Sequence, residues 1–310
     1  MADKSEEKFL QYIKPLVIDG LHGRVLSLPA PEDHDREILF IYGQHSTIER
    51  WRGLSAVFNE YGAVTMPDLP GFGGMDSFYK IGKEPTMDNL ADYLATFIKS
   101  QYGDKRLSIA GMSIGFAMVT RMLQRHPDIA ERVDLLVSIV GLAHHDDFLF
   151  TPGRMRFYRI GSTIFSRRLP AWIFRNVFLQ PAWLRRVYKY SRNAKQKFED
   201  KDKAELRQTM DMEIILWHAN DLRTQMFTNL EMFKLDNCTT RLPMPVWHVD
   251  VEADRYFDGT QVERHYRMIF SDFYVARSDV DNHAPSVIAD AQTAAPYLPP
   301  ALRHELSKAR

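Results

Sequence analysis

The chain has 310 residues, of which 45% are hydrophobic and 26% are charged. This composition is typical of a folded protein with a large core and excludes a disordered chain. Basic and acidic residues number 40 each, so the formal net charge of zero argues against a generally basic nucleic-acid-binding protein. The single cysteine, Cys238, excludes an internal disulfide and a zinc site built on several thiolates, and it fits a reducing compartment.

The N-terminal residues 1–17 lack both a long apolar stretch and a small-residue cleavage pattern, which predicts that there is no signal peptide. The longest apolar runs, such as residues 135–143, are too short to span a bilayer. We therefore expect a cytoplasmic protein, and we leave peripheral contact with a membrane open.

Short apolar runs alternate with amphipathic stretches along the first half of the chain, which is typical of a parallel sheet flanked by helices. The predicted elements there are a hairpin over 16–28, strands over 37–42, 62–67, 106–110 and 133–140, and helices over 48–61, 87–102 and 114–124. The pattern breaks after Gly141 and then resumes. The later elements are strands over 243–251 and 273–276, a helix over 261–268, and helical segments over 287–297 and 301–309.

The interruption predicts an insertion in the sheet. We expect an α/β core with a mostly parallel, doubly wound sheet, formed by residues 1–143 and 240–310. Residues 144–239 show no clear strands and are predicted to form a helical cap, with further helix over 213–235 returning to the sheet.

The segment 151–197 differs in composition from the rest of the chain. It contains twelve basic residues, nine aromatic residues and no acidic residue, which leaves 28 basic and 40 acidic residues elsewhere. Such a segment could contact an anionic membrane, attract an anionic substrate or cover an apolar acyl chain. Ordinary helices that bury aromatics and expose arginines would have the same composition, so both interpretations stay open.

The strongest local motif is Gly111-Met112-Ser113-Ile114-Gly115, which lies between a predicted strand and a predicted helix. A serine in such a sharp strand-to-helix turn is held at the edge of the sheet, where it can attack a carbonyl carbon. Glycines on both sides of the turn allow the strand and the helix to pack closely. The alternative is a glycine-rich turn with a capping serine.

With this motif the sequence resembles the α/β-hydrolase family, in its branch with a serine nucleophile and a helical cap. The resemblance also covers Tyr42-Gly43-Gln44-His45 after the third predicted strand and Asp68-Leu-Pro-Gly-Phe-Gly after the fourth. It implies hydrolysis of an ester or thioester of a hydrophobic acyl compound through an acyl-enzyme. Because the elbow holds Ser113, the aspartate-dependent dehalogenase-like and epoxide-hydrolase-like relatives are excluded.

The family's chain order of nucleophile, acid and histidine implies the rest of a catalytic triad. His283 lies in a polar turn after the last predicted strand and is the expected base, whereas His265 and His304 fall in predicted helices. Asp254 follows the strand over 243–251 and is the expected acid. The competing acids are Asp250, Glu252 and Asp258 nearby, and Asp146 and Asp147 after the sixth predicted strand.

The resemblance also implies an oxyanion hole made by the backbone N–H groups of Gln44 and Ile114. Tyr42 replaces the histidine that usually precedes the glycine, but backbone donors do not depend on that side chain. The residues expected to line the pocket are Gly43, His45 and Met112.

We expect neither a cofactor nor a metal, because the chain has no phosphate-binding or dinucleotide-binding glycine motif. The run His144-His145-Asp146-Asp147 lacks the helical spacing of metal ligands. The expected partner is a small acyl substrate, with anionic membrane contact through 151–197 left open and no nucleic acid. The alternatives are an acyltransferase with the same triad, or a non-catalytic ligand-binding protein of the same fold.

Overall fold

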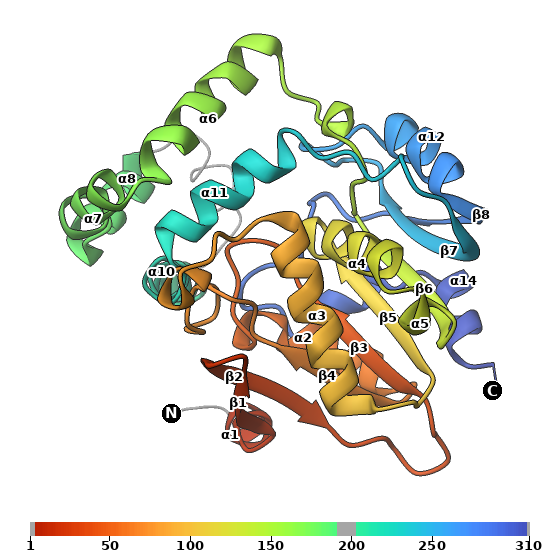
Figure 1. The fold of residues 1–310 in the computed structure, drawn as a ribbon. Helices are drawn as coiled ribbons and strands as arrows, with labels where there is room; N and C mark the ends of the chain where they lie inside the picture. The colour runs from red at the N-terminus through yellow and green to blue at the C-terminus, as the bar shows by residue number, and fades with distance from the viewer. Residues whose placement is uncertain (1–3, 191–202, 309–310) are drawn as a thin grey trace.

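The computed structural model describes residues 4–190 and 203–308 (Figure 1). Its centre is an eight-stranded sheet with the order β1-β2-β4-β3-β5-β6-β7-β8. The strands are β1 Ile13–Ile18, β2 Leu21–Leu28, β3 Glu37–Ile41, β4 Ala63–Pro67, β5 Leu107–Met112, β6 Val133–Ile139, β7 Leu242–Val251 and β8 Phe270–Ser278. Strand β2 pairs antiparallel with β1 and β4, and the pairs from β4 to β8 are parallel.

The central parallel strands β3, β5 and β6 are almost entirely buried because helices pack against the sheet. Every residue of β5 is buried, as the apolar run in the sequence indicated. In the view of Figure 1, α3 and α4 lie in front of the sheet. The helices of this core are α1 Lys4–Leu10, η1 Glu49–Trp51, α2 Arg52–Asn59, η2 Phe78–Ile81, α3 Met87–Tyr102, α4 Ile114–Arg125, α5 Pro127–Ala130, α12 Gly259–Ile269, α13 Ala291–Ala294, η4 Ala295–Tyr297 and α14 Pro300–Leu306.

Between β6 and β7 the chain forms a helical insertion that extends beyond the sheet (Figure 1). Its elements are η3 His145–Asp147, α6 Pro152–Phe165, α7 Arg168–Val177, α8 Pro181–Tyr190, α10 Lys203–Ala219 and α11 Leu222–Met232. The insertion has a small core of its own, made of Ala171, Leu179, Leu184 and Leu222. The predicted mostly parallel sheet with inserted helices is confirmed, whereas the residue boundaries of the two domains stay a prediction.

Three predicted helices differ in detail from the observed ones. The helix over 48–61 begins with the 3-10 turn η1, and the segment over 287–297 is helical only from Ala291. The later start has a local cause, because the Asp290 carboxylate caps the helix by accepting the Thr293 N–H at 2.9 Å. The returning helix is broken before α11, where the Asp221 carboxylate accepts the Thr224 N–H at 2.7 Å. Residue 309 of the last predicted helix lies outside the described residues.

Over residues 4–190 and 203–308, none of the helices combines the length and the apolar character needed to cross a bilayer.

Candidate active site

Ser113 occupies a strained turn between β5 and α4. Its φ of 52° and ψ of −128° lie outside the regions that residues with a side chain prefer. A Cβ on Gly111 would lie 2.6 Å from Phe116 Cα, and a Cβ on Gly115 would lie 2.4 Å from the Tyr42 carbonyl oxygen. Only glycine fits at both positions, so the predicted strand-turn-helix context is confirmed together with its steric cause.

Backbone hydrogen bonds hold this turn against the neighbouring strand. The Ser113 N–H donates to the Ile139 carbonyl at 3.0 Å, and the Ser113 carbonyl accepts the Phe116 N–H at 3.0 Å. The Ser113 side chain itself is partly exposed. The hydroxyl therefore sits on a rigid support at the carboxyl edge of the sheet, with one side open to a ligand.

The loop after β3 passes beside this hydroxyl. A Cβ on Gly43 would lie 3.2 Å from Ser113 Cβ and 3.8 Å from its Oγ. Within the part of the chain that the structure describes, the backbone N–H groups of Gln44 and Ile114 have no hydrogen-bond acceptor. These N–H groups are the two donors expected to bind an oxyanion, and that role stays a prediction.

The side chains of this loop connect it to the inserted helices. Gln44 Nε2 donates to the Gln225 carbonyl at 2.7 Å and to Thr228 Oγ1 at 2.6 Å, both on α11. The imidazole of His45 packs on Trp217 of α10, with the ring centroids 4.5 Å apart. The sequence analysis placed Gln44 and His45 near the pocket but missed these contacts, which fix the loop to α10 and α11.

Asp254 and His283 form a hydrogen-bonded pair. Asp254 follows β7, His283 lies in the loop after β8, and the distance from His283 Nδ1 to Asp254 Oδ2 is 2.7 Å. Only 16% of the histidine side chain and 8% of the aspartate side chain are exposed. The other carboxylate oxygen accepts the Tyr256 N–H at 2.7 Å, which fixes its orientation. When Nδ1 donates to the carboxylate, Nε2 carries the lone pair that a general base needs.

The sheet topology brings these residues to one edge. Strands β5, β7 and β8 are parallel to β6 or to each other, so the loops that follow them leave the same end of the sheet. Ser113, Asp254 and His283 each follow one of these strands. No hydrogen bond joins Ser113 to His283 within residues 4–190 and 203–308, so the structure presents the serine turn and the acid–histidine pair as separate parts.

The competing acids have other partners or positions. Asp147 Oδ1 lies 2.5 Å from His265 Nδ1, and its Oδ2 accepts the Ala143 and His144 N–H groups. Asp258 caps α12 by accepting the Thr260 N–H at 2.9 Å. In the described part of the chain, no hydrogen bond or ion pair joins His283 to the remaining candidates: Asp250 lies within β7, Glu252 is exposed in the turn that follows, and Asp146 is exposed in η3.

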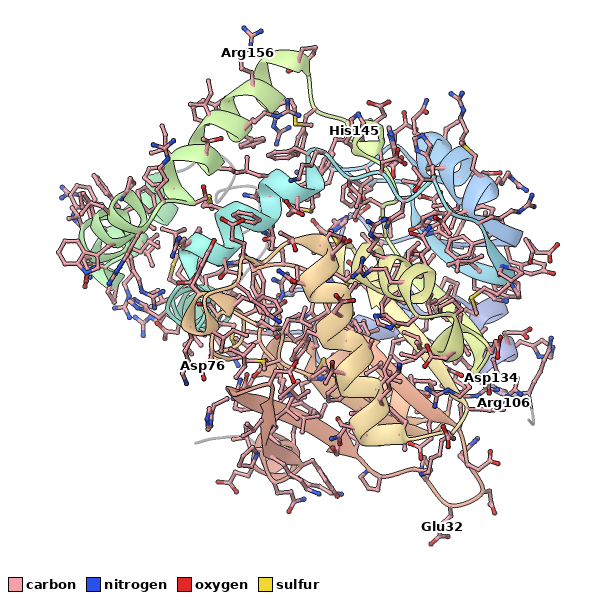
Figure 2. The ribbon with its side chains drawn as sticks, in the orientation of Figure 1. Glu32, Asp76, Arg106, Asp134, His145 and Arg156 are labelled. Atoms are coloured by element: carbon pink, nitrogen blue, oxygen red, sulfur yellow. The ribbon has the colours of Figure 1, made fainter. Side chains whose placement is uncertain are left out.

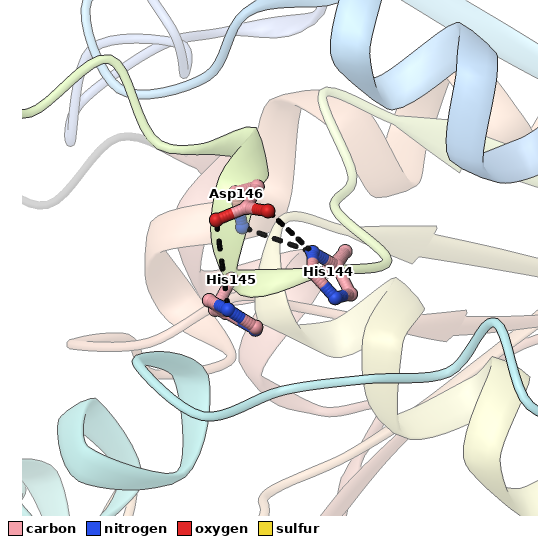
Figure 3. Close-up of side chains that lie close together, drawn as sticks. All are labelled: His144, His145 and Asp146. Carbon is pink, nitrogen blue, oxygen red and sulfur yellow. Dashed lines mark hydrogen bonds and ion pairs between the residues drawn. The ribbon is translucent and has the colours of Figure 1, made fainter.

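One group of residues could supply ligands to a metal ion. Donor atoms of His144, His145 and Asp146 all lie within 4.8 Å of one another (Figure 3). The same run was set aside in the sequence because it lacks helical spacing, but the 3-10 turn η3 brings these consecutive residues together. His144 Nδ1 already accepts the Asp146 N–H at 3.1 Å, so a hydrogen-bonded turn accounts for the arrangement. Serine-dependent acyl transfer does not require these residues.

The comparisons with known proteins agree on the fold. A bromoperoxidase from Bacillus anthracis has a TM-score of 0.63 and 13% identity, and covers 93% of this chain and 96% of its own. A membrane phospholipase A described as a bacterial virulence factor has a TM-score of 0.62 and 18% identity. That match covers 96% of this chain and 87% of the phospholipase. A thermophilic esterase from Thermogutta terrifontis has a TM-score of 0.60 and 15% identity. That match covers 95% of this chain and 96% of the esterase. No protein-family model and no curated protein matches the chain.

The architecture is therefore that of the α/β-hydrolase fold, as the resemblance carried by the elbow motif predicted. The helical insertion lies between β6 and β7 within this fold.

Proposed function

We propose that this protein is a serine hydrolase that cleaves an ester or thioester of a hydrophobic acyl compound through an acyl-enzyme. The observation that carries the proposal is the strained Ser113 turn at the same sheet edge as the hydrogen-bonded Asp254–His283 pair. A binding protein would have no need for a serine held at this cost beside two free backbone donors.

In this mechanism Ser113 Oγ attacks the carbonyl carbon of the substrate while His283 Nε2 accepts the hydroxyl proton. The oxyanion of the tetrahedral intermediate accepts hydrogen bonds from the Gln44 and Ile114 N–H groups. His283 then donates the proton to the leaving alcohol or thiol, which leaves an acyl-serine. Water, deprotonated by His283, attacks the acyl-serine and releases the acid, while Asp254 orients the imidazole and stabilises its cationic form.

An apolar acyl group is supported by what covers the loop after β3. Trp217 of α10 packs on His45, with the ring centroids 4.5 Å apart. Apolar walls with a few polar groups are typical of sites for acyl chains. The phospholipase and the esterase that share the fold act on esters by their names, which fits the same class of reaction.

The test is turnover of p-nitrophenyl esters of short and long acyl chains by the wild type, Ser113→Ala and Ser286→Ala. Ser286 is exposed in the loop that holds His283 and serves as the matched control. We expect wild-type turnover, about a 10⁶-fold loss in Ser113→Ala and wild-type rates in Ser286→Ala. Full activity in Ser113→Ala, or no turnover of any ester by the wild type, would contradict the proposal. Product analysis with an added alcohol separates hydrolysis from acyl transfer.

A further inference from the structure

We propose that the outer surface of α6 and α7 docks on an anionic lipid bilayer. The proposal rests on the exposed side chains of these two helices and not on the ester hydrolysis proposed above. It deepens the expectation of membrane contact by assigning it to particular residues.

The first observation is a concentration of exposed apolar side chains. Among the described residues, nine of the 17 exposed large hydrophobic side chains lie between residues 157 and 183. The most exposed are Phe157 at 72%, Leu169 at 66% and Trp172 at 61%. Scattered exposed apolar residues are normal, but a contiguous apolar patch on one segment marks an interaction site.

The second observation is the side of each helix on which these residues lie. On α7 they are Leu169, Trp172, Ile173 and Val177, which share one face by their helical spacing. The opposite face holds the buried Ala171 and the partly buried Phe174, whose ring lies 4.6 Å from that of Phe165. The exposed apolar face of α7 is thus turned away from the molecule's own core. On α6 the corresponding residues are Phe157, Ile160 and Ile164.

An apolar groove of about 280 Å³ borders this surface, where Leu169 and Ile173 of the exposed face meet Phe165 and Phe174 of the inner side. It is lined only by apolar side chains, those of Phe165, Leu169, Pro170, Ile173, Phe174 and Phe178. No hydrogen-bonding side chain lines it, so a hydrocarbon chain fits it better than a polar ligand does.

The third observation is charge. Eight arginines and no acidic residue lie between residues 151 and 186. Arg156, Arg167 and Arg168 are exposed and make no ion pair with any residue that the structure describes. Figure 2 shows Arg156 pointing outward from α6. Arg167 and Arg168 directly precede Leu169, so cationic and apolar groups alternate along the surface, as they do in helices that lie in a membrane interface.

The same charge argues against a second copy of the chain as the occupant. A symmetric contact through this surface would bring the arginines of one copy against those of the other, and no acidic residue between 151 and 186 could offset them. An anionic bilayer offers phosphate groups to the arginines and hydrocarbon to Trp172 and Leu169. Helices α6, α7 and α8 lie at the outer edge of the molecule, where a flat surface can reach them (Figure 1).

The test is co-sedimentation of the full chain with vesicles of phosphatidylcholine alone, or of phosphatidylcholine and phosphatidylglycerol in equal parts. We expect binding to the mixed vesicles that weakens with salt, and weak binding to phosphatidylcholine. Arg167→Gln and Arg168→Gln should each lower the binding about fivefold. Leu169→Gln combined with Trp172→Gln should lower it at least about tenfold.

Matched controls are Met268→Gln and Lys83→Gln, which change an exposed apolar and an exposed charged residue elsewhere. Both should bind as the wild type does, and so should Ser113→Ala, because docking does not require turnover. Circular dichroism shows whether each variant is folded. A blue shift of tryptophan emission on adding vesicles should diminish in Trp172→Phe, a variant that keeps an aromatic side chain at this exposed position.

Several results would overturn the proposal. They are no binding of the wild type to the mixed vesicles, equal loss in the control variants, or unchanged binding in the Leu169 and Trp172 double variant. A dimer in solution that Trp172→Gln dissociates, without vesicle binding, would assign the surface to a second copy instead.

Discussion

Two histidine–aspartate pairs in this molecule have nearly the same contact and very different surroundings. The distance from Nδ1 to the carboxylate is 2.7 Å in His283–Asp254 and 2.5 Å in His265–Asp147. The first pair lies in two loops that follow β7 and β8. The second joins η3, at the start of the insertion, to the helix α12.

The surroundings separate the two pairs by role. Both aspartates have both oxygens occupied, but Asp147 binds His265 and the N–H groups of Ala143 and His144 at the point where the chain leaves the sheet. That pair holds the entry to the insertion in place. The His283–Asp254 pair lies at the edge where Ser113 ends β5, so it can serve a reaction. The two contact distances therefore do not decide which pair is catalytic, and the proposed role of Asp254 and His283 rests on their loops after β7 and β8.

The largest expected effect comes from His283→Leu. Removing the base should lower kcat/KM for a p-nitrophenyl ester about 10⁶-fold, because the serine then has no group to accept its proton. The free energy of unfolding should change much less than in His265→Leu. Steady-state kinetics beside urea unfolding measures both quantities, and near-normal turnover would contradict the assignment of the base.

Asp254→Asn should have the next largest effect. The amide keeps the shape of the carboxylate but no longer stabilises the cationic imidazole or selects its tautomer, so we expect about a 10⁴-fold loss in kcat. KM should change little, because Asp254 does not contact the substrate. A larger loss of kcat in folded Asp147→Asn than in folded Asp254→Asn would contradict this assignment. The catalytic role would then belong to the Asp147–His265 pair.

His265→Leu should affect stability and not catalysis. It leaves the buried Asp147 carboxylate without its histidine, and breaking such a buried pair costs about 3 to 5 kcal/mol of unfolding free energy. The kcat of the folded fraction should stay close to the wild-type value. Urea unfolding and active-site titration measure the two quantities, and a large loss of kcat with unchanged stability would make His265 part of the reaction.

The smallest effect concerns His248, a buried histidine of β7 whose Nδ1 lies 3.0 Å from Ser138 Oγ. Complete burial opposes the charged imidazole and lowers the pKa of His248 to about 4. The unfolded chain, with a histidine pKa of about 6.5, then binds more protons than the folded chain between pH of about 6.5 and about 4. Titration of His248 therefore costs no unfolding free energy above pH of about 6.5. As the pH falls to about 4, it lowers the unfolding free energy by about 3 kcal/mol.

His248→Asn removes this titration. Its unfolding free energy should depend less steeply on pH across the same window than that of the wild type, whatever its value at neutral pH. An equally steep dependence in the variant would show that other groups cause the acid sensitivity.

The sheet and the serine turn were predictable because their signals are local. Apolar runs mark buried strands, and Gly111 and Gly115 are required by contacts within a few residues of the turn or with the adjacent strand. Asp254 was chosen among neighbouring acids by the family's chain order and the strand before it, and its role stays a prediction. These features need no knowledge of how distant segments meet.

The remaining features depend on contacts that no local pattern encodes. Gln44 binds Gln225 and Thr228, which lie more than 180 positions later in the chain. The pairing of Asp147 with His265 spans 118 positions. Whether the aromatic residues of 151–197 are buried or exposed also depends on packing, and for Trp172 the structure shows exposure. Residues 191–197 of that segment lie outside the described residues.

The most direct test of the central claim is labelling with a fluorophosphonate, with the modified residue mapped by mass spectrometry. The account predicts one label on Ser113, fast in the wild type and in His265→Leu, much slower in His283→Leu and absent in Ser113→Ala. Labelling of another serine, or equal rates in the wild type and His283→Leu, would contradict it.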